Sequence, residues 1–406
     1  METATSDNSF QLDILNVFLM AFIMFVLGIL FKQTLFEMEI DLMAWIRENH
    51  RSSILDEIWM WIIYPTELKM IQVFWVALYL YSDPVLAFKC TFVTIIQIFI
   101  VSTVKLISQI PRPYWLNHKM RVSMWALDYS GPSDHIWVGA LFYNYLILIF
   151  YYKYAEGLSN SKGLNLDMLS SCFSGADLNR RRKIVIISLL VLSNTYILIT
   201  GVSLFYLGQT FLIESMAGLI YSVLLVAIFI RMDADIHKYC EHLCFDIYKS
   251  RRNKFMLLFY CIGAFVVTII YYRSMISEYN IQPQWMKSQW LRRLEYRYEI
   301  GLDYTYFDFA NLFTLIGAAF GCAFATTHID GYLLQNTETW KRALRWCIGT
   351  VLYLAIIHMA SLIPADNYLT EYVLVKILPN LFASYVVFGI FPYTWQFIGK
   401  LWWSKL

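Results

Sequence analysis

Two basic side chains near residue 110 have the types and the spacing that phosphate binding needs. The apolar run 86–108 contains Lys105 and leads into Gln-Ile-Pro-Arg112-Pro113. A lysine inside an apolar helix is costly and marks a candidate functional site. Lys105 and Arg112 are seven residues apart, about two helical turns, so both can face one side. Together they predict a phosphate clamp, although a lysine that reaches the membrane surface and an interfacial arginine give the same pattern.

A second polar segment opens the next apolar run. It reads Gly-Pro-Ser133-Asp134-His135. A helix N-terminus presents unpaired N–H groups to an anion, and the Ser133 hydroxyl can add a further donor. His135 can protonate a leaving oxygen near neutral pH. The alternative is an ordinary helix cap followed by an interfacial histidine.

Taken together, the two segments resemble the type 2 phosphatidic acid phosphatase superfamily. The shared pattern is Lys105, six residues, Arg112-Pro113, and then Pro-Ser133-x-His135. That superfamily includes lipid phosphate phosphatases, glucose-6-phosphatases and vanadium haloperoxidases. The flanking residues are most similar to the sphingosine-1-phosphate phosphatase branch, and the resemblance covers roughly 50–330. It implies that Lys105, Arg112 and Ser133 bind phosphate and that His135 acts as the catalytic acid.

The third motif of that superfamily is degraded in this chain. Its pattern is Ser-Arg, five residues, His, three residues, Asp, and the matching positions hold Ser203-Leu204, Thr210 and Glu214. The resemblance implies that the missing histidine is the nucleophile, that the arginine binds phosphate and that the aspartate orients the histidine. In addition, Asp134 replaces a glycine of the second motif, and we expect its carboxylate either to repel phosphate or to be protonated when phosphate binds. A threonine hydroxyl needs an activating base, so efficient catalysis is not expected.

Composition places these segments in a membrane protein. The chain has 406 residues, of which 59% are hydrophobic and 15% charged, whereas soluble domains carry about 25% charged residues. A membrane-spanning helix needs roughly 20 mostly apolar residues. We therefore predict an all-α polytopic membrane protein of about ten transmembrane helices. It forms a single domain over 1–406 with a phosphatase-like helical core at 86–230. The predicted spans are 12–31, 66–82, 86–108, 136–152, 184–202, 211–230, 255–273, 307–328, 344–363 and 370–396.

Ten spans would place all three motifs on the side opposite the N-terminus, here called side B; the N-terminal side is side A. Lys and Arg are more frequent in the side-A loops, notably at 180–183, which predicts a cytoplasmic side A and a luminal motif side. The expected location is the endoplasmic reticulum or another endomembrane. The net charge of +2 predicts no nucleic-acid partner. No cofactor and no metal are predicted; a metal site at His237, Cys240 and Cys244 was the weaker alternative, because one helix cannot surround an ion.

Three functions are compatible with these patterns. The first is a lipid-phosphate phosphatase relative with impaired catalysis that binds the phosphorylated headgroup of a membrane lipid. The second is an active phosphatase of sphingoid-base phosphates or similar lipids. The third is a structural membrane subunit or a lipid transporter built on the same scaffold. The sequence names no protein partner.

Overall fold

The computed structural model describes residues 32–82, 84–117, 129–155, 178–242, 305–328, 338–363 and 372–402, with five isolated positions between 259 and 270. Every regular element in these ranges is helical, as the all-α prediction requires. The first half contains α2 (Lys32–Asn49), α3 (Ser53–Ile63), α4 (Leu68–Ala77), η2 (Leu78–Ser82), α5 (Pro84–Ser108), α6 (Pro113–Leu116), α7 (Asp134–Ala155), α9 (Leu178–Tyr206), α10 (Leu212–Arg231) and α11 (Asp233–Glu241). The second half contains α14 (Thr305–His328), α15 (Thr339–Ser361), η6 (Tyr372–Ile377), α17 (Leu378–Tyr385), η7 (Val386–Ile390) and α18 (Phe391–Trp402).

Five helical stretches in the described residues are long and apolar enough to cross a membrane, which supports an integral membrane protein. They are Pro84–Lys105, Ile184–Tyr206, Leu212–Arg231, Thr339–Ser361 and Val373–Ile398. Three shorter apolar helices occupy Leu68–Tyr81, Asp134–Phe150 and Ala310–Ala325. Of the ten predicted spans, 12–31 lies outside the described residues and so does most of 255–273. The number ten therefore stays a prediction.

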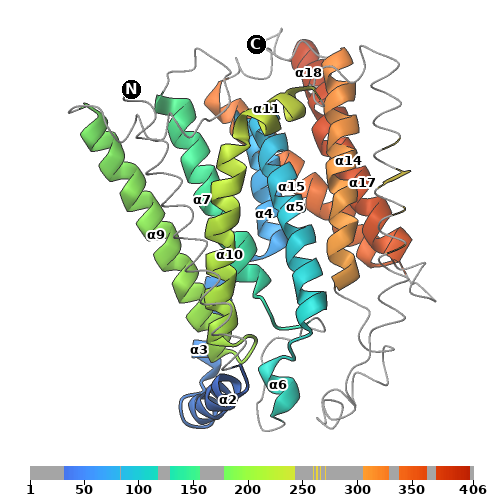
Figure 1. Cartoon of the computed structure of the whole chain (residues 1–406). Helices are drawn as coiled ribbons and strands as arrows, with labels where there is room; N and C mark the ends of the chain where they lie inside the picture. The colour runs from blue at the N-terminus through green and yellow to red at the C-terminus, as the bar shows by residue number, and fades with distance from the viewer. Residues whose placement is uncertain are drawn as a thin grey trace.

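Helix α5 lies at the centre of the helices that carry the motifs. In its apolar stretch 78% of the residues are buried, compared with 22% for α9, whose exposed side is apolar. Helix α7 packs against α5, α9 and α10 (Figure 1). Most of the buried apolar residues of α5 and α7 belong to one large core cluster. Helix α5, which ends at the first motif, and helix α7, which begins at the second, therefore contribute much of the buried core.

A buried ion pair fixes the opposite, side-A end of α5. Lys89 Nζ lies 2.5 Å from Asp233 Oδ1, and the Tyr145 hydroxyl donates to the same oxygen at 2.8 Å. The side chains of Lys89 and Asp233 are 5% and 1% exposed. Because neither charge reaches solvent, removal of one residue would leave the other as an unpaired buried charge, which is costly. The contact joins α5 and α7 to α11, which lies across the side-A end in Figure 1.

The C-terminal helices pack closely on one another and on the first half. Gly321 of α14 faces Gly389 of η7, and a Cβ atom added at Gly389 would stand 2.7 Å from the Cα atom of Gly321. Small residues allow this approach of two helix backbones. The Gln72 amide donates to Asn311 Oδ1 at 3.1 Å, and the Tyr79 hydroxyl donates to the Phe388 carbonyl at 2.5 Å. These two bonds connect α4 and η2 to the C-terminal group.

The segment 32–65, which the ten-span prediction left as a side-B loop, forms two helices. Helix α3 runs along α9, because the Tyr206 hydroxyl donates to the His50 carbonyl at 3.1 Å and the Tyr196 hydroxyl donates to the Ile62 carbonyl at 2.7 Å. Ten residues of helix rise about 15 Å, so α3 climbs along α9 away from the side-B end. A helix alongside α9 is therefore already present before residue 66, where the second predicted span was expected to begin. In Figure 1, α2 is seen nearly end-on below α9 and α10.

We predict that Lys89→Ala lowers the free energy of unfolding by about 3–5 kcal/mol, because it leaves the Asp233 carboxylate buried without its cation. Lys89→Met combined with Asp233→Leu should recover most of this loss. Thermal unfolding of the purified protein in detergent measures both effects. Lys341→Ala is the control, because Lys341 pairs at 3.4 Å with Glu338, which is 62% exposed, and should change stability by less than about 1 kcal/mol. A double variant as unstable as Lys89→Ala would contradict the interpretation.

Candidate functional site

Three chain segments meet at the side-B end, and proline shapes the first two. Helix α5 ends at Ser108, Gln109 adopts a φ of 45°, and the prolines on either side of Arg112 prevent the helix from continuing. Pro132 precedes the start of α7 at Asp134. The Ser130 N–H donates to the Ile110 carbonyl at 2.9 Å, and the Ser108 hydroxyl donates to the Gly131 carbonyl at 2.8 Å. The first two motifs are therefore held together through the backbone.

Lys105 forms an ion pair with the residue that departs from the second motif. Its Nζ atom lies 3.1 Å from Asp134 Oδ1. The Lys105 side chain is 1% exposed and that of Asp134 is 38% exposed. His135 and Arg112 also interact electrostatically with the Asp134 carboxylate. The carboxylate that we expected to repel phosphate therefore lies among the very cations that were predicted to bind phosphate or donate a proton.

Arg112 contacts the segment that carries the third motif. Its guanidinium donates to the Gln209 carbonyl at 3.0 Å and lies 3.3 Å from Gln209 Oε1. Arg112 is buried. Its acceptor Gln209 directly precedes Thr210 in the chain. The contact brings the residue predicted to bind phosphate next to the residue that stands at the nucleophile position.

Ser133 and Glu214 lie on either side of the same junction. Ser133 is fully buried, and its hydroxyl has no hydrogen-bond partner within the part of the chain that the structure describes. The Ser130 hydroxyl donates to the Glu214 carboxylate. A Cβ atom added at Gly218, one turn beyond Glu214, would stand 3.0 Å from the Ser133 carbonyl oxygen. Glycine therefore allows α10 to pack against the start of α7.

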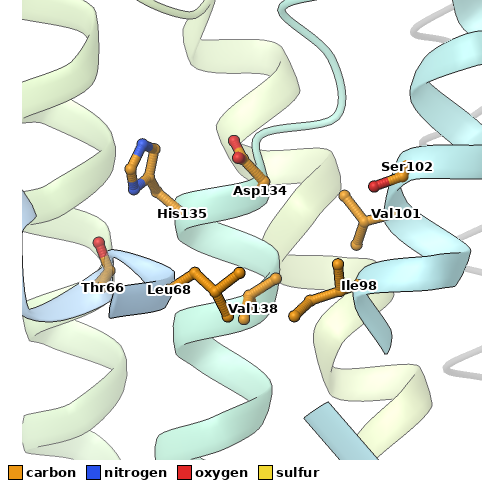
Figure 2. A pocket seen from close by; sticks show the side chains of 8 residues that line it. All are labelled: Thr66, Leu68, Ile98, Val101, Ser102, Asp134, His135 and Val138. Carbon is orange, nitrogen blue, oxygen red and sulfur yellow. The ribbon is translucent and has the colours of Figure 1, made fainter. Parts of the chain in front are cut away.

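His135 borders a small cavity next to this junction. The cavity has a volume of about 40 Å³, which is room for roughly three water molecules. Figure 2 shows His135 and Asp134 projecting from the first turn of α7 on one side and apolar side chains on the other. The full lining comprises Thr66, Leu68, Ile98, Val101, Ser102, Asp134, His135 and Val138. The cavity therefore combines polar side chains at the start of α7 with a mostly apolar lining.

At the position of the third motif, the hydrogen bond described for the Thr210 hydroxyl is to another hydroxyl group. Thr210 is 1% exposed, and its Oγ1 atom lies 3.4 Å from the Ser215 hydroxyl oxygen. A serine hydroxyl does not remove a proton from threonine near neutral pH. Leu204, at the position of the missing arginine, is buried in an apolar cluster with Ile136 and Ile197. The three motif segments are thus close together, but the third supplies neither an imidazole nor a guanidinium.

Helix α2 supplies contacts to the third motif that the sequence patterns did not indicate. The Glu39 carboxylate accepts the N–H groups of Leu212 and Ile213 at 2.7 and 3.3 Å, and the Phe36 ring stacks on Phe211 with centroids 4.1 Å apart. Burial raises the pKa of Glu39, and the two N–H donors act against that increase. Glu39 precedes Leu212 by 173 residues, so no local pattern signals the contact.

The predicted metal alternative is only partly covered by the structure, because Cys244 lies outside the described residues. Among the residues that are described, no group of three or more metal-ligating side chains is arranged to hold an ion. Cys240 is buried near Lys89 and Asp233, where the ion pair already occupies the polar groups. A metal at this position therefore gains no support.

Comparison with known proteins gives one match. No curated protein and no solved structure matches the chain. Residues 86–238 match the family model of the PAP2 superfamily, a range that contains all three motif segments, and this match supports membership of that superfamily.

Proposed function

We propose that the protein binds the phosphorylated headgroup of a membrane lipid on a phosphatase-like scaffold whose catalysis is impaired. The observation that carries the proposal is the surroundings of Thr210, whose hydroxyl lies beside the Ser215 hydroxyl rather than beside a base. Lys105 pairs with Asp134, the residue that follows Ser133, and Arg112 contacts the segment of the third motif, which supports the proposal that these three residues bind the anion. His135 remains a candidate proton donor at the cavity.

The charges of the site oppose turnover as well. The formal charges of Lys105, Arg112, Asp134 and Glu214 cancel, whereas a phosphate monoester near neutral pH carries between one and two negative charges. Phosphate bound at Lys105 has to displace the Asp134 carboxylate from its 3.1 Å contact. Headgroup binding is therefore weaker than in a site where this lysine faces a glycine.

The alternatives from the sequence remain proposals of lower rank. An active lipid phosphate phosphatase would need His135 or Thr210 in a new role, and a structural subunit or lipid transporter would need only the helical scaffold. We further propose that the functional core covers 86–230, that the ligand belongs to the sphingoid-base phosphates, and that side B faces the lumen of an endomembrane. The motif flanks support the ligand class, and the excess of basic residues on side A supports the orientation.

Replacement of Asp134 tests the electrostatic argument. We predict that Asp134→Asn tightens binding of a fluorescent sphingoid-base phosphate to the protein in nanodiscs by roughly 10-fold or more, because Lys105 no longer shares its charge with a carboxylate. Asp41→Asn is the matched control, since it removes the same charge from the exposed face of α2 and should leave the affinity unchanged. Weaker or equal binding by Asp134→Asn would contradict the proposal.

Restoring the third motif tests the catalytic argument. The wild-type protein should hydrolyse lipid phosphates at least about 10³-fold more slowly than a family member with an intact motif. Thr210→His alone should recover little, whereas Asp134→Gly, Leu204→Arg and Thr210→His together should give measurable phosphate release.

Leu204→Arg places a cation in an apolar cluster, so the thermal stability of the triple variant has to be measured in parallel. Rapid hydrolysis by the wild type that His135→Ala abolishes would overturn the impaired-enzyme proposal and favour an active enzyme with a rearranged mechanism.

A further inference from the structure

Helix α2 is attached at both ends to elements that enclose the α9–α10 loop, residues 207–211. At one end, Glu39 and Phe36 contact the start of α10 and Phe211. At the other end, the Arg47 guanidinium pairs with Asp56 of α3 at 2.6 Å and lies 5.6 Å from the ring of Tyr206 in the last turn of α9. Glu39 and Arg47 are eight residues apart, about 12 Å along the helix. Helix α2 therefore bridges the two helices that the loop connects.

The outward side of α2 is divided into an apolar stripe and an acidic stripe. Met38, Leu42 and Trp45 follow at intervals of four and three residues and are 65%, 49% and 54% exposed. This spacing places them on one face of a helix. The exposed acidic residues lie on the neighbouring face, and they are Glu37, Asp41 and Glu48. The buried side, with Phe36, Met43 and Arg47, points to the protein.

Two neighbouring helices, α3 and α9, also expose apolar side chains. Helix α3 exposes Ile54, Ile58 and Trp61, again at intervals of four and three residues, and it packs along α9. Helix α9 is itself a candidate membrane span with an exposed apolar side. A helix that lies across the ends of membrane spans, with apolar and acidic stripes side by side, fits the boundary between lipid and water. The occupant of the apolar stripe is therefore the lipid surface rather than a soluble protein.

We infer that α2 is an interfacial helix that binds the side-B lipid surface through Met38, Leu42 and Trp45 and thereby positions the α9–α10 loop. The loop contains Gln209, the acceptor of the Arg112 guanidinium, and Thr210. Glu39 is a positioning residue in this arrangement, because it holds the first N–H groups of α10 without lining the cavity. The inference concerns the membrane contact and the loop, and it holds whether or not the protein has phosphatase activity.

Fluorescent labelling of neighbouring positions on α2 tests the membrane contact. Met38→Cys and Leu42→Cys probe the apolar stripe, and Glu37→Cys and Asp41→Cys are matched controls on the same helix. Each variant is labelled with an environment-sensitive dye and reconstituted in vesicles with spin-labelled lipids. The labelled unsubstituted protein gives the signal of the seven native cysteines. Lipid quenching should be at least about twofold stronger at 38 and 42 than at 37 and 41. Equal quenching at all four positions, or stronger quenching at 37 and 41, would overturn the inference.

Hydrogen exchange of the peptide that covers 207–213 tests the effect on the loop. In vesicles, Glu39→Ala should speed its exchange by about fivefold, the effect of losing one helix cap, and Glu39→Gln should have a smaller effect because an oxygen acceptor remains. Glu37→Ala is the control and should change nothing. Met38→Glu with Leu42→Glu should also speed exchange at 207–213, although neither residue is part of the loop. Unchanged exchange in this last variant, or in Glu39→Ala, would refute the coupling between membrane contact and loop.

Discussion

The ion pair between Lys105 and Asp134 determines what the side-B end of the molecule can bind. A lysine that is 1% exposed at the end of a membrane-spanning helix requires a negative partner, since an unpaired charge there is costly. In the superfamily pattern that the sequence resembles, a glycine stands where Asp134 stands here, and an anionic ligand can fill the role of partner. In this chain, the protein supplies that anion from the first turn of α7. Under the proposed function, the headgroup and the Asp134 side chain therefore compete for the same cation.

The same physical requirement organises the opposite end. Lys89 pairs with Asp233 inside the side-A end, sixteen residues and about 24 Å along α5 from Lys105. Both pairs connect α5 to the elements that follow it in the core, α7 at one end and α11 at the other. Close packing of mostly apolar side chains holds the middle of the helix, and the Gln97 amide adds a bond to the Trp137 carbonyl of α7 at 2.5 Å. Charge thus fixes the register of the helix ends, and packing fills the space between them.

Local sequence patterns located the first two motif segments, whose superfamily resemblance the family match supports, and gave no indication of what surrounds them. Lys105 with Arg112, and Ser133 with His135, were recognisable because proline, glycine and buried basic residues leave signals within a few positions. Asp134 was expected to repel a ligand, and the pairing with Lys105 needed the fold to bring two helix ends together. Helix α2 was not predicted as a membrane span because charged residues occur in nearly every turn. Its contact between Glu39 and Leu212 joins residues 173 positions apart, which no local pattern indicates.

The exposure of Asp134 bears on which of the proposed functions the site can serve. Its side chain is 38% exposed, whereas Lys105 is almost fully buried, so only the carboxylate can leave the pair for water at moderate cost. In the function proposed above, a phosphate group would take over the Lys105 contact, and it could also bind the Ser133 hydroxyl, which has no hydrogen-bond partner among the described residues. This exchange is compatible with reversible headgroup binding. Turnover needs in addition a nucleophile with a base, and among the described residues the Thr210 hydroxyl contacts the Ser215 hydroxyl at 3.4 Å, which is not a base. The proposed function therefore retains headgroup binding and lacks the catalytic step that an intact third motif would supply.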